Sequence, residues 1–189
     1  MSIFKVNVTD RRTNTLVQAD LSEASKEDVT NNQIKLKFNW KDRWNSAACY
    51  CECERLFKLE YQGELQGLMH VTLLPYPPPD GKAEYVEICA LESVKDRYRL
   101  VNPIGQWLVW YAVNLALEYD CAGDEHGFVL LLESVESAVD YYENKVNMEK
   151  VRPISLGEDG DGYVFSFSQR QSFRYLESMA ECYGKPIEG

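Results

Sequence analysis

Short apolar runs alternate with stretches of helical periodicity through the middle of this chain. The run Tyr85–Leu91 follows the breaker segment Pro77–Gly81 and is rich in residues that favour strands. From Ile104 to Tyr119, apolar residues recur at spacings of three and four, which predicts a helix. Gly127–Leu132 predicts a second strand, and Ser137–Lys145 a second, shorter helix. This order of strand, loop, helix, strand and helix predicts a mixed α/β fold.

The segment before the longer helix is basic, although the chain as a whole has a formal net charge of −10. It contains Lys95, Arg97 and Arg99. Because Asn102 is a favourable N-cap and Pro103 is tolerated at the first helical position, we expect the helix to begin at or just after Pro103. A helix start attracts phosphate groups. The segment is therefore interpreted as a pyrophosphate cradle, with an ordinary helix start beside a solvated loop as the alternative.

Three motifs stand out along the chain: the early hairpin Tyr61–Val71, the loop Val94–Arg99 followed by Ile104-Gly105, and the helix Ala138–Glu143 followed by Asn147–Val151. Together they resemble the GCN5-related N-acetyltransferase (GNAT) family. The resemblance covers roughly residues 56–168. It implies a mixed, strongly twisted central sheet of about six to seven strands, a usual size for a globular sheet, with helices on both faces.

The resemblance also implies one domain spanning residues 1–189. Residues 1–55 would form a variable, acceptor-side part, and residues 56–168 the recognisable core. In the family, acetyl-CoA lies between two parallel strands that splay apart. Its pantetheine arm pairs with one of them like an added strand, and the resemblance identifies that strand as Tyr85–Leu91. The expected cofactor-binding residues are Leu91, Arg99, Val101, Asn102, Ile104, Gly105 and Gln106. Arg99 is expected to neutralise a phosphate charge.

Catalysis in the family requires an acid for the departing thiolate and a base for the ammonium group of the acceptor. The resemblance places Tyr142 near the sulfur as the general acid, while Tyr141 points to another face of the helix. Glu84, Glu87 and Glu92 are candidate bases on or beside the first strand, and Glu87 is our choice. The alternatives are an aromatic core residue for Tyr142 and an exposed carboxylate without function for Glu87.

The chain departs from the family pattern in the loop before the longer helix. Pro103 stands where the first glycine of a Gly-x-Gly pair is usual, and the loop has one residue more. Proline lacks a backbone N–H, so one phosphate donor is missing. Asn147-Met148 also replaces a Gly-Phe pair. The leading hypothesis is an acetyl-CoA-dependent N-acetyltransferase acting on a primary amine. The alternative is a catalytically degenerate GNAT-fold protein that binds acyl-CoA or a protein partner.

Charge and cysteine content limit the partners that we expect. A net charge of −10 argues against a nucleic-acid surface and favours a cationic amine acceptor. No apolar run is long enough to span a bilayer, and no signal peptide is recognised, so we expect a cytoplasmic protein. The cluster Cys49, Cys51 and Cys53 lacks the usual spacing of a zinc site, and we expect thiols and no metal.

The remaining segments give coarser predictions. Residues 3–8 predict a strand, and residues 22–31 a short helix that opens at Ser22 or Ser25. Trp40 and Trp44 could line a substrate pocket or pack in the core. The strand predicted at 162–168 contains Tyr163–Phe167, which is apolar enough for a homodimer contact or an internal partner. Residues from about Cys182 are expected to fray.

Overall fold

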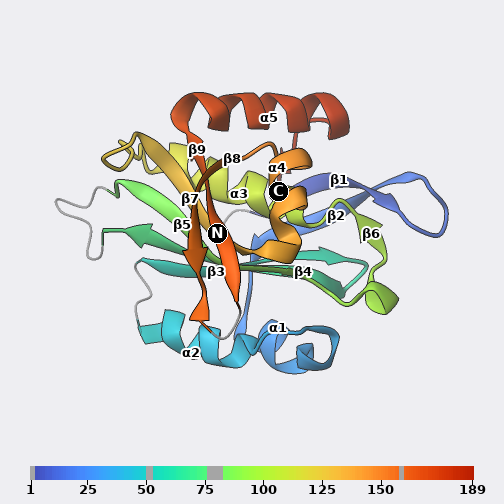
Figure 1. The fold of residues 1–189 in the computed structure, drawn as a ribbon. Coiled ribbons are helices and arrows are strands. Elements are labelled where there is room, and N and C mark those ends of the chain that lie inside the picture. The colour runs from blue at the N-terminus through green and yellow to red at the C-terminus, as the bar shows by residue number, and fades with distance from the viewer. Residues whose placement is uncertain (1–2, 50–52, 76–82, 158–159) are drawn as a thin grey trace. The chain divides into compact units, whose positions relative to one another are not determined.

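The structure is a computed structural model that describes residues 3–49, 53–75, 83–157 and 160–189 (Figure 1). The chain divides into two compact units. Unit 1 contains Met1–Val71, Ala90–Leu108 and Met179–Gly189, and unit 2 contains Thr72–Cys89 and Val109–Ser178. The predicted breaker Pro77–Gly81 and Cys51 lie outside the described residues.

Antiparallel pairing dominates unit 1. Its strands are β1 (Phe4–Asp10), β2 (Leu16–Glu23), β3 (Glu54–Tyr61), β6 (Val101–Asn102), β10 (Ile187–Glu188) and parts of β4 (Glu64–Leu74) and β5 (Tyr85–Ser93). The strand order is β10-β1-β2-β3-β4-β5, and β6 pairs with β1 off this path. The predicted hairpin is confirmed, because β3 and β4 are joined by a turn in which Gly63 has a φ of 75°.

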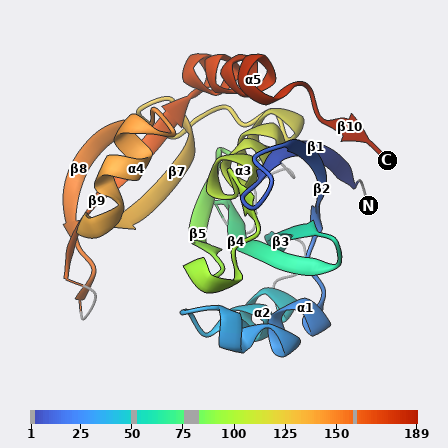
Figure 2. The ribbon, with the colours of Figure 1, turned by 90° about the vertical axis from the view of Figure 1, so that its right-hand side faces the viewer.

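Two α-helices and a short 3-10 helix connect β2 to β3. They are α1 (Lys26–Asn31), η1 (Gln33–Lys35) and α2 (Trp40–Cys49). The predicted helix opening at Ser25 is confirmed, since Ser25 and Asp28 form a capping box. Asp28 also accepts a hydrogen bond of 2.9 Å from Lys58 of β3, which ties the helix to the sheet. Figure 2 shows α1 and α2 side by side next to β3.

A buried apolar cluster joins these helices to the sheet within unit 1. It contains Ala24, Val29, Leu36, Trp40, Ala47, Leu56, Leu65, Leu68, Ala90 and Val94. Trp40 is fully buried, and its indole N–H donates a 2.8 Å hydrogen bond to Glu92. Removing this much apolar surface from water is the main stabilising contribution that such a cluster makes.

The predicted central helix is α3 (Gly105–Glu118). Trp107, Leu108 and Val109 are fully buried, as expected for a helix that is apolar on all sides. Within unit 1, the Trp107 indole N–H donates a 2.9 Å hydrogen bond to the carbonyl of Asn7 in β1. The polar tip of this buried side chain is therefore satisfied.

Unit 2 contains the parallel strand pair. Its strand order is β5-β7-β9-β8, with β7 at Phe128–Val135, β8 at Glu149–Ser155 and β9 at Asp161–Ser168. The parallel ladder joins only Val86–Ile88 to Leu130–Leu132, although β7 continues to Val135. Strand β9 is antiparallel to both β7 and β8, so both of its edges have intramolecular partners. A dimer contact through the edge of this strand would have to displace one of them.

Three further helical segments belong wholly or mainly to unit 2, which also contains most of α3. They are η4 (Glu136–Ala138), α4 (Val139–Asn144) and α5 (Gln169–Tyr183). Figure 2 shows α4 lying along the strands β7, β8 and β9. The helix predicted between Ser137 and Lys145 is thus present, in two parts.

The predicted mixed α/β class, with a sheet flanked by helices, is confirmed. The described residues form ten strands, more than the six to seven expected, and no sequence pattern predicts β2, β6, β8 or β10. The prediction that the chain frays from Cys182 is wrong. Helix α5 continues to Tyr183, and β10 pairs with β1 through Phe4 and Glu188.

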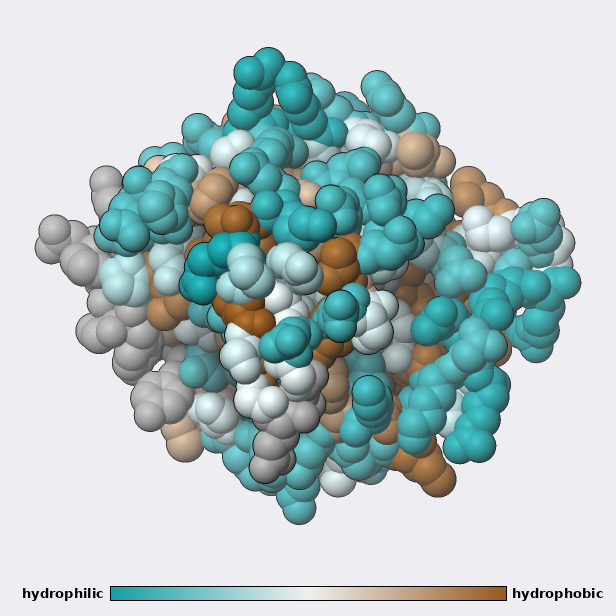
Figure 3. All heavy atoms as spheres, in the orientation of Figure 1, coloured by the Kyte–Doolittle hydropathy of each residue, from teal (hydrophilic) through white to brown (hydrophobic). Residues whose placement is uncertain are grey.

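Polar side chains cover much of the face seen in the orientation of Figure 1. The face shown in Figure 3 is mainly hydrophilic, with small separate brown areas. Within the described part of the chain, no helix is both long and apolar enough to cross a membrane.

Candidate functional site

The basic loop between β5 and α3 is held in place by Gln66 of β4. The Gln66 side chain is fully buried, and its Oε1 accepts a 2.7 Å hydrogen bond from the backbone N–H of Leu100. The Gln66 backbone carbonyl accepts a 2.8 Å bond from the N–H of Val94. One residue therefore binds both ends of the loop that contains η3 (Asp96–Tyr98).

The β1–β2 turn supplies a second support for this loop. Arg11 donates from its backbone N–H to the carbonyl of Leu100 at 2.8 Å, and its guanidinium contacts Asp96 at 3.0 Å. The same guanidinium reaches the carbonyl of Arg99 at 3.3 Å. The backbone and the side chain of Arg11 thus both bind the loop and stabilise its conformation.

Asn102 does not cap α3, so that prediction is wrong. Val101 and Asn102 form β6, in which Asn102 pairs with Thr9 and Val101 with Asp10. This pairing keeps the segment extended, and α3 starts only at Gly105. The helix still begins just after Pro103, as expected. Val101 is buried and Asn102 exposed, so the two predicted cofactor residues differ in their access to solvent.

Arg99 is half-buried within the loop. Its guanidinium donates a 3.4 Å hydrogen bond to the carbonyl of Val94, and its Nε is buried with no hydrogen-bond partner among the described residues. The other expected cofactor residues of unit 1 lie at both ends of the loop. Leu91 is half-buried in β5, while Ile104 and Gly105 are buried at the start of α3 and Gln106 is half-buried.

Tyr142 lies in α4 of unit 2 and is 7% exposed. Its ring lies 5.6 Å from that of Phe165 and 5.2 Å from the half-buried Tyr141. Burial raises the pKa of Tyr142 to about 12, and no described residue forms a hydrogen bond with its hydroxyl. The phenol therefore stays protonated at neutral pH and keeps a proton to donate.

The three carboxylates considered as bases have different surroundings. Glu87 is half-buried in β5 within unit 2. Burial raises its pKa, and the neighbouring carboxylate of Glu133 raises it further. Glu92 instead accepts hydrogen bonds from the backbone of Lys37 and Phe38 and from Trp40, so its position is structural. Glu84 is exposed.

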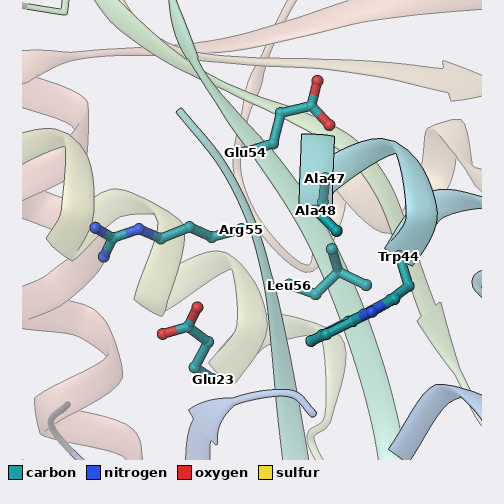
Figure 4. Close-up of a pocket in the computed structure, with 7 residues that line it drawn as sticks. All are labelled: Glu23, Trp44, Ala47, Ala48, Glu54, Arg55 and Leu56. Atoms are coloured by element: carbon teal, nitrogen blue, oxygen red, sulfur yellow. The ribbon is translucent and has the colours of Figure 1, made fainter. Parts of the chain in front are cut away.

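The two tryptophans of α2 have separate roles. Trp40 is a core residue, whereas Trp44 is half-buried and lines a pocket between α2 and β3. Figure 4 shows the Trp44 ring beside Leu56, with Ala47 and Ala48 on the same helix as Trp44. The hypothesis of an aromatic pocket wall therefore applies to Trp44 and not to Trp40.

The described cysteines, including Cys49 and Cys53, are thiols. Cys53 is buried and Cys49 exposed. Over the ranges that the structure describes, no group of three or more His, Cys, Asp or Glu side chains is placed to hold a metal ion.

Comparison with known proteins gives matches in structure alone. No family model matches the sequence, and no curated protein sequence does. Ard1 from Thermoplasma volcanium has a TM-score of 0.57 at 13% identity, covering 80% of this chain and 97% of its own. Naa50 from Arabidopsis thaliana, solved with the bisubstrate analogue CoA-Ac-MVNAL, has a TM-score of 0.57 at 19% identity. The match covers 80% of this chain and 99% of the Naa50 chain.

An acetyltransferase of the GNAT family from Bacillus cereus has a TM-score of 0.54 at 8% identity, covering 80% of this chain and 97% of its own. The chain has the GNAT fold. In this fold the parallel strands are expected to splay apart, and the short ladder between β5 and β7 agrees with that geometry. At these identities the likeness is one of fold.

Sequence reasoning missed three residues that shape the site. The predicted hairpin Tyr61–Val71 includes Gln66 and His70 without a role for either side chain, and no pattern points to Arg11. His70 is 5% exposed and bonds to Glu54 through its Nε2 at 3.0 Å. A polar residue within an apolar strand was the available signal for Gln66 and His70, because buried polar groups need partners.

Proposed function

We propose that this protein is an acetyl-CoA-dependent N-acetyltransferase that moves an acetyl group onto a primary amine. The observation that carries the proposal is the GNAT fold together with a basic loop held rigidly before a 14-residue helix. The start of such a helix has a partial positive charge, which favours bound phosphate groups.

Unit 1 offers the phosphate-binding groups. Arg99 is the candidate charge partner, because its Nε lacks a partner among the described residues. Gly105 begins α3, where the absence of a side chain lets a phosphate approach the backbone. Gln66 and Arg11 position the loop beforehand, which lowers the entropy cost of binding.

The acyl donor supplies the acetyl group as a thioester. In the proposed reaction, Glu87 takes a proton from the acceptor ammonium, directly or through water, and so frees the nitrogen for attack. Its raised pKa makes it a stronger base than an ordinary carboxylate. The nitrogen forms a bond to the thioester carbonyl carbon, and Tyr142 donates its proton to the sulfur as the carbon–sulfur bond breaks. The second proton that the nitrogen loses then restores the phenol of Tyr142. The high pKa of its phenol keeps that proton available.

One observation favours the second candidate, a GNAT-fold protein that binds acyl-CoA or a protein partner without catalysis. Val101 and Asn102 pair with β1, and Pro103 has no backbone N–H. Both features reduce the number of backbone donors that this loop can offer to a pyrophosphate.

Calorimetric titration with acetyl-CoA tests the proposal. We expect micromolar binding that is lost in Arg99→Ala and in Gly105→Trp, and kept in Arg152→Ala, which removes an exposed arginine of β8. Absence of binding to acetyl-CoA and to longer acyl-CoAs would overturn the enzyme reading. Binding without any acetylation of a panel of primary amines would favour the second candidate.

A further inference from the structure

A pocket of about 270 Å³ lies within unit 1, apart from the basic loop. Helix α2 contributes Trp44, Ala47 and Ala48 to it, and β3 contributes Glu54 and Leu56. Apart from the carboxylate of Glu54, these side chains offer an apolar and aromatic lining. Glu23 and Arg55 complete the described lining, so the apolar wall carries two carboxylates and one guanidinium.

Glu54 is held by a buried histidine. Its Oε2 lies 3.0 Å from Nε2 of His70, and the Glu54 side chain is 17% exposed. Because a carboxylate only accepts hydrogen bonds, Nε2 of His70 must carry the proton. Burial lowers the pKa of His70, and the nearby guanidinium of Arg43 lowers it as well, although Glu54 acts in the opposite direction. The imidazole is therefore neutral at pH 7. The pair keeps a net negative charge.

The other imidazole nitrogen of His70 strengthens this assignment. Nδ1 is buried and has no hydrogen-bond partner among the described residues. In the tautomer with the proton on Nε2, Nδ1 has only a lone pair, whose burial costs less than that of an unpaired N–H. His70 therefore acts on the pocket through Glu54, which it orients.

The pocket has a polar end and an aromatic end. In Figure 4 the Glu54 carboxylate and the Trp44 ring lie on opposite sides of Ala47 and Ala48. The guanidinium of Arg55 extends away from the Trp44 ring. Among the described lining residues, the two carboxylates of Glu23 and Glu54 outnumber the single guanidinium of Arg55. A cation suits this lining, and an anion does not.

We propose that this pocket binds a primary amine with a small aromatic or apolar body, its ammonium group on Glu54 and its body against Trp44. Identification of this amine as the acetyl acceptor rests on the proposed function, whereas binding itself does not. An ammonium group donates charge-assisted hydrogen bonds to a carboxylate, and a flat aromatic body stacks on an indole.

Titration with phenethylamine, without acetyl-CoA, tests the inference by calorimetry. The neutral analogue 2-phenylethanol has a similar shape and lacks the charge. We expect phenethylamine to bind the wild-type protein and 2-phenylethanol to bind roughly tenfold to a hundredfold more weakly, the usual difference for a hydrogen bond to a charged group. Equal binding of the two, or no binding of phenethylamine up to its solubility limit, would overturn the inference.

Single-residue variants test the separate roles of Glu54, Trp44 and His70 in phenethylamine binding. Glu54→Gln is expected to weaken phenethylamine binding to the level of the neutral analogue, whereas Glu27→Gln, at an exposed position of α1, leaves it unchanged. Trp44→Ala should weaken both ligands. His70→Gln keeps an N–H for Glu54 and should retain most binding, whereas His70→Leu should not. An unaltered affinity in both Glu54→Gln and His70→Leu would exclude the assigned roles.

The outcome is independent of the cofactor experiment. Phenethylamine binding in a protein that does not bind acetyl-CoA would leave this inference standing and remove the acetyltransferase function. Acetyl-CoA binding without phenethylamine binding would overturn this inference and leave the proposed acetyltransferase function standing. Acetylation of phenethylamine that is lost in Glu54→Gln would join the two.

Discussion

Gly67 of β4 sets the distance between the sheet and the start of α3, and its replacement by alanine should destabilise the protein. A Cβ at this position would lie 2.4 Å from Cγ2 of Ile104 and 3.2 Å from Cδ1 of Leu108. Carbon atoms in good contact are about 3.5–4.0 Å apart, so Ile104 would have to move by about 1 Å or more. The Glu92 carbonyl oxygen, 3.1 Å from the added Cβ, limits movement of β4.

Gly67→Ala overpacks the core, and we expect it to lower the free energy of unfolding by about 1–3 kcal/mol. For a chain of this size it corresponds to a decrease of roughly 2–12 °C in Tm. Because Ile104 directly precedes Gly105, the displaced residue also shifts the start of α3. We therefore expect acetyl-CoA affinity to fall in Gly67→Ala if the proposed site is correct.

Chemical denaturation of a double-mutant cycle provides the assay. Ile104→Ala removes the clashing Cγ2, so the double variant should be more stable than the sum of the single changes predicts, by about 1 kcal/mol or more. Additive effects of Gly67→Ala and Ile104→Ala would refute the steric explanation. An unchanged Tm for Gly67→Ala alone would refute the packing geometry itself.

Three further changes test other parts of the structure. Glu92→Gln weakens the acceptor of three hydrogen bonds from the segment before and within α2, and urea denaturation should show a loss of about 1–3 kcal/mol. Glu87→Gln should increase stability at pH 7. The pKa of Glu87 is raised in the folded state, so ionisation of its carboxyl lowers the free energy of unfolding at pH 7. The stability gained by Glu87→Gln should therefore vanish as the pH falls below the ordinary carboxyl pKa of 4.5. An equal gain at pH 3 and pH 7 would exclude ionisation of Glu87 as its cause. Tyr142→Phe should lower kcat by about 10²–10⁴-fold with acetyl-CoA affinity unchanged, and a wild-type kcat would remove Tyr142 as the acid.

Sequence patterns located most of the elements whose signals are local. The apolar period of α3, the capping box at Ser25 and the turn at Gly63 each depend on neighbouring residues, and the structure has all three. Helix α5 was not predicted, although its buried residues Ser172, Tyr175 and Met179 recur at helical spacing. This spacing is the local signal for the helix.

The shorter strands had no local signal. β6 and β10 contain two residues each, and they are strands only because they pair with β1. Asn102 has the sequence of a helix cap, but pairing with Thr9 keeps it extended. Long-range pairing overrides a local preference here, since an extended segment paired at a sheet edge satisfies its backbone groups.

The sequence by itself determined the α/β class, the order of strand, basic loop and helix, and the identity of Arg99, Glu87 and Tyr142 as candidates. The class and the order of elements follow from residue types and spacing along the chain, whereas the three candidate residues follow from the resemblance to the GNAT family. Tertiary structure alone decided that Gln66 and Arg11 hold the loop, that Trp40 is core while Trp44 faces a pocket, and that His70 meets Glu54. The reason is physical: hydrogen bonds and burial join residues that are distant in sequence, and only the folded chain brings their donors and acceptors together.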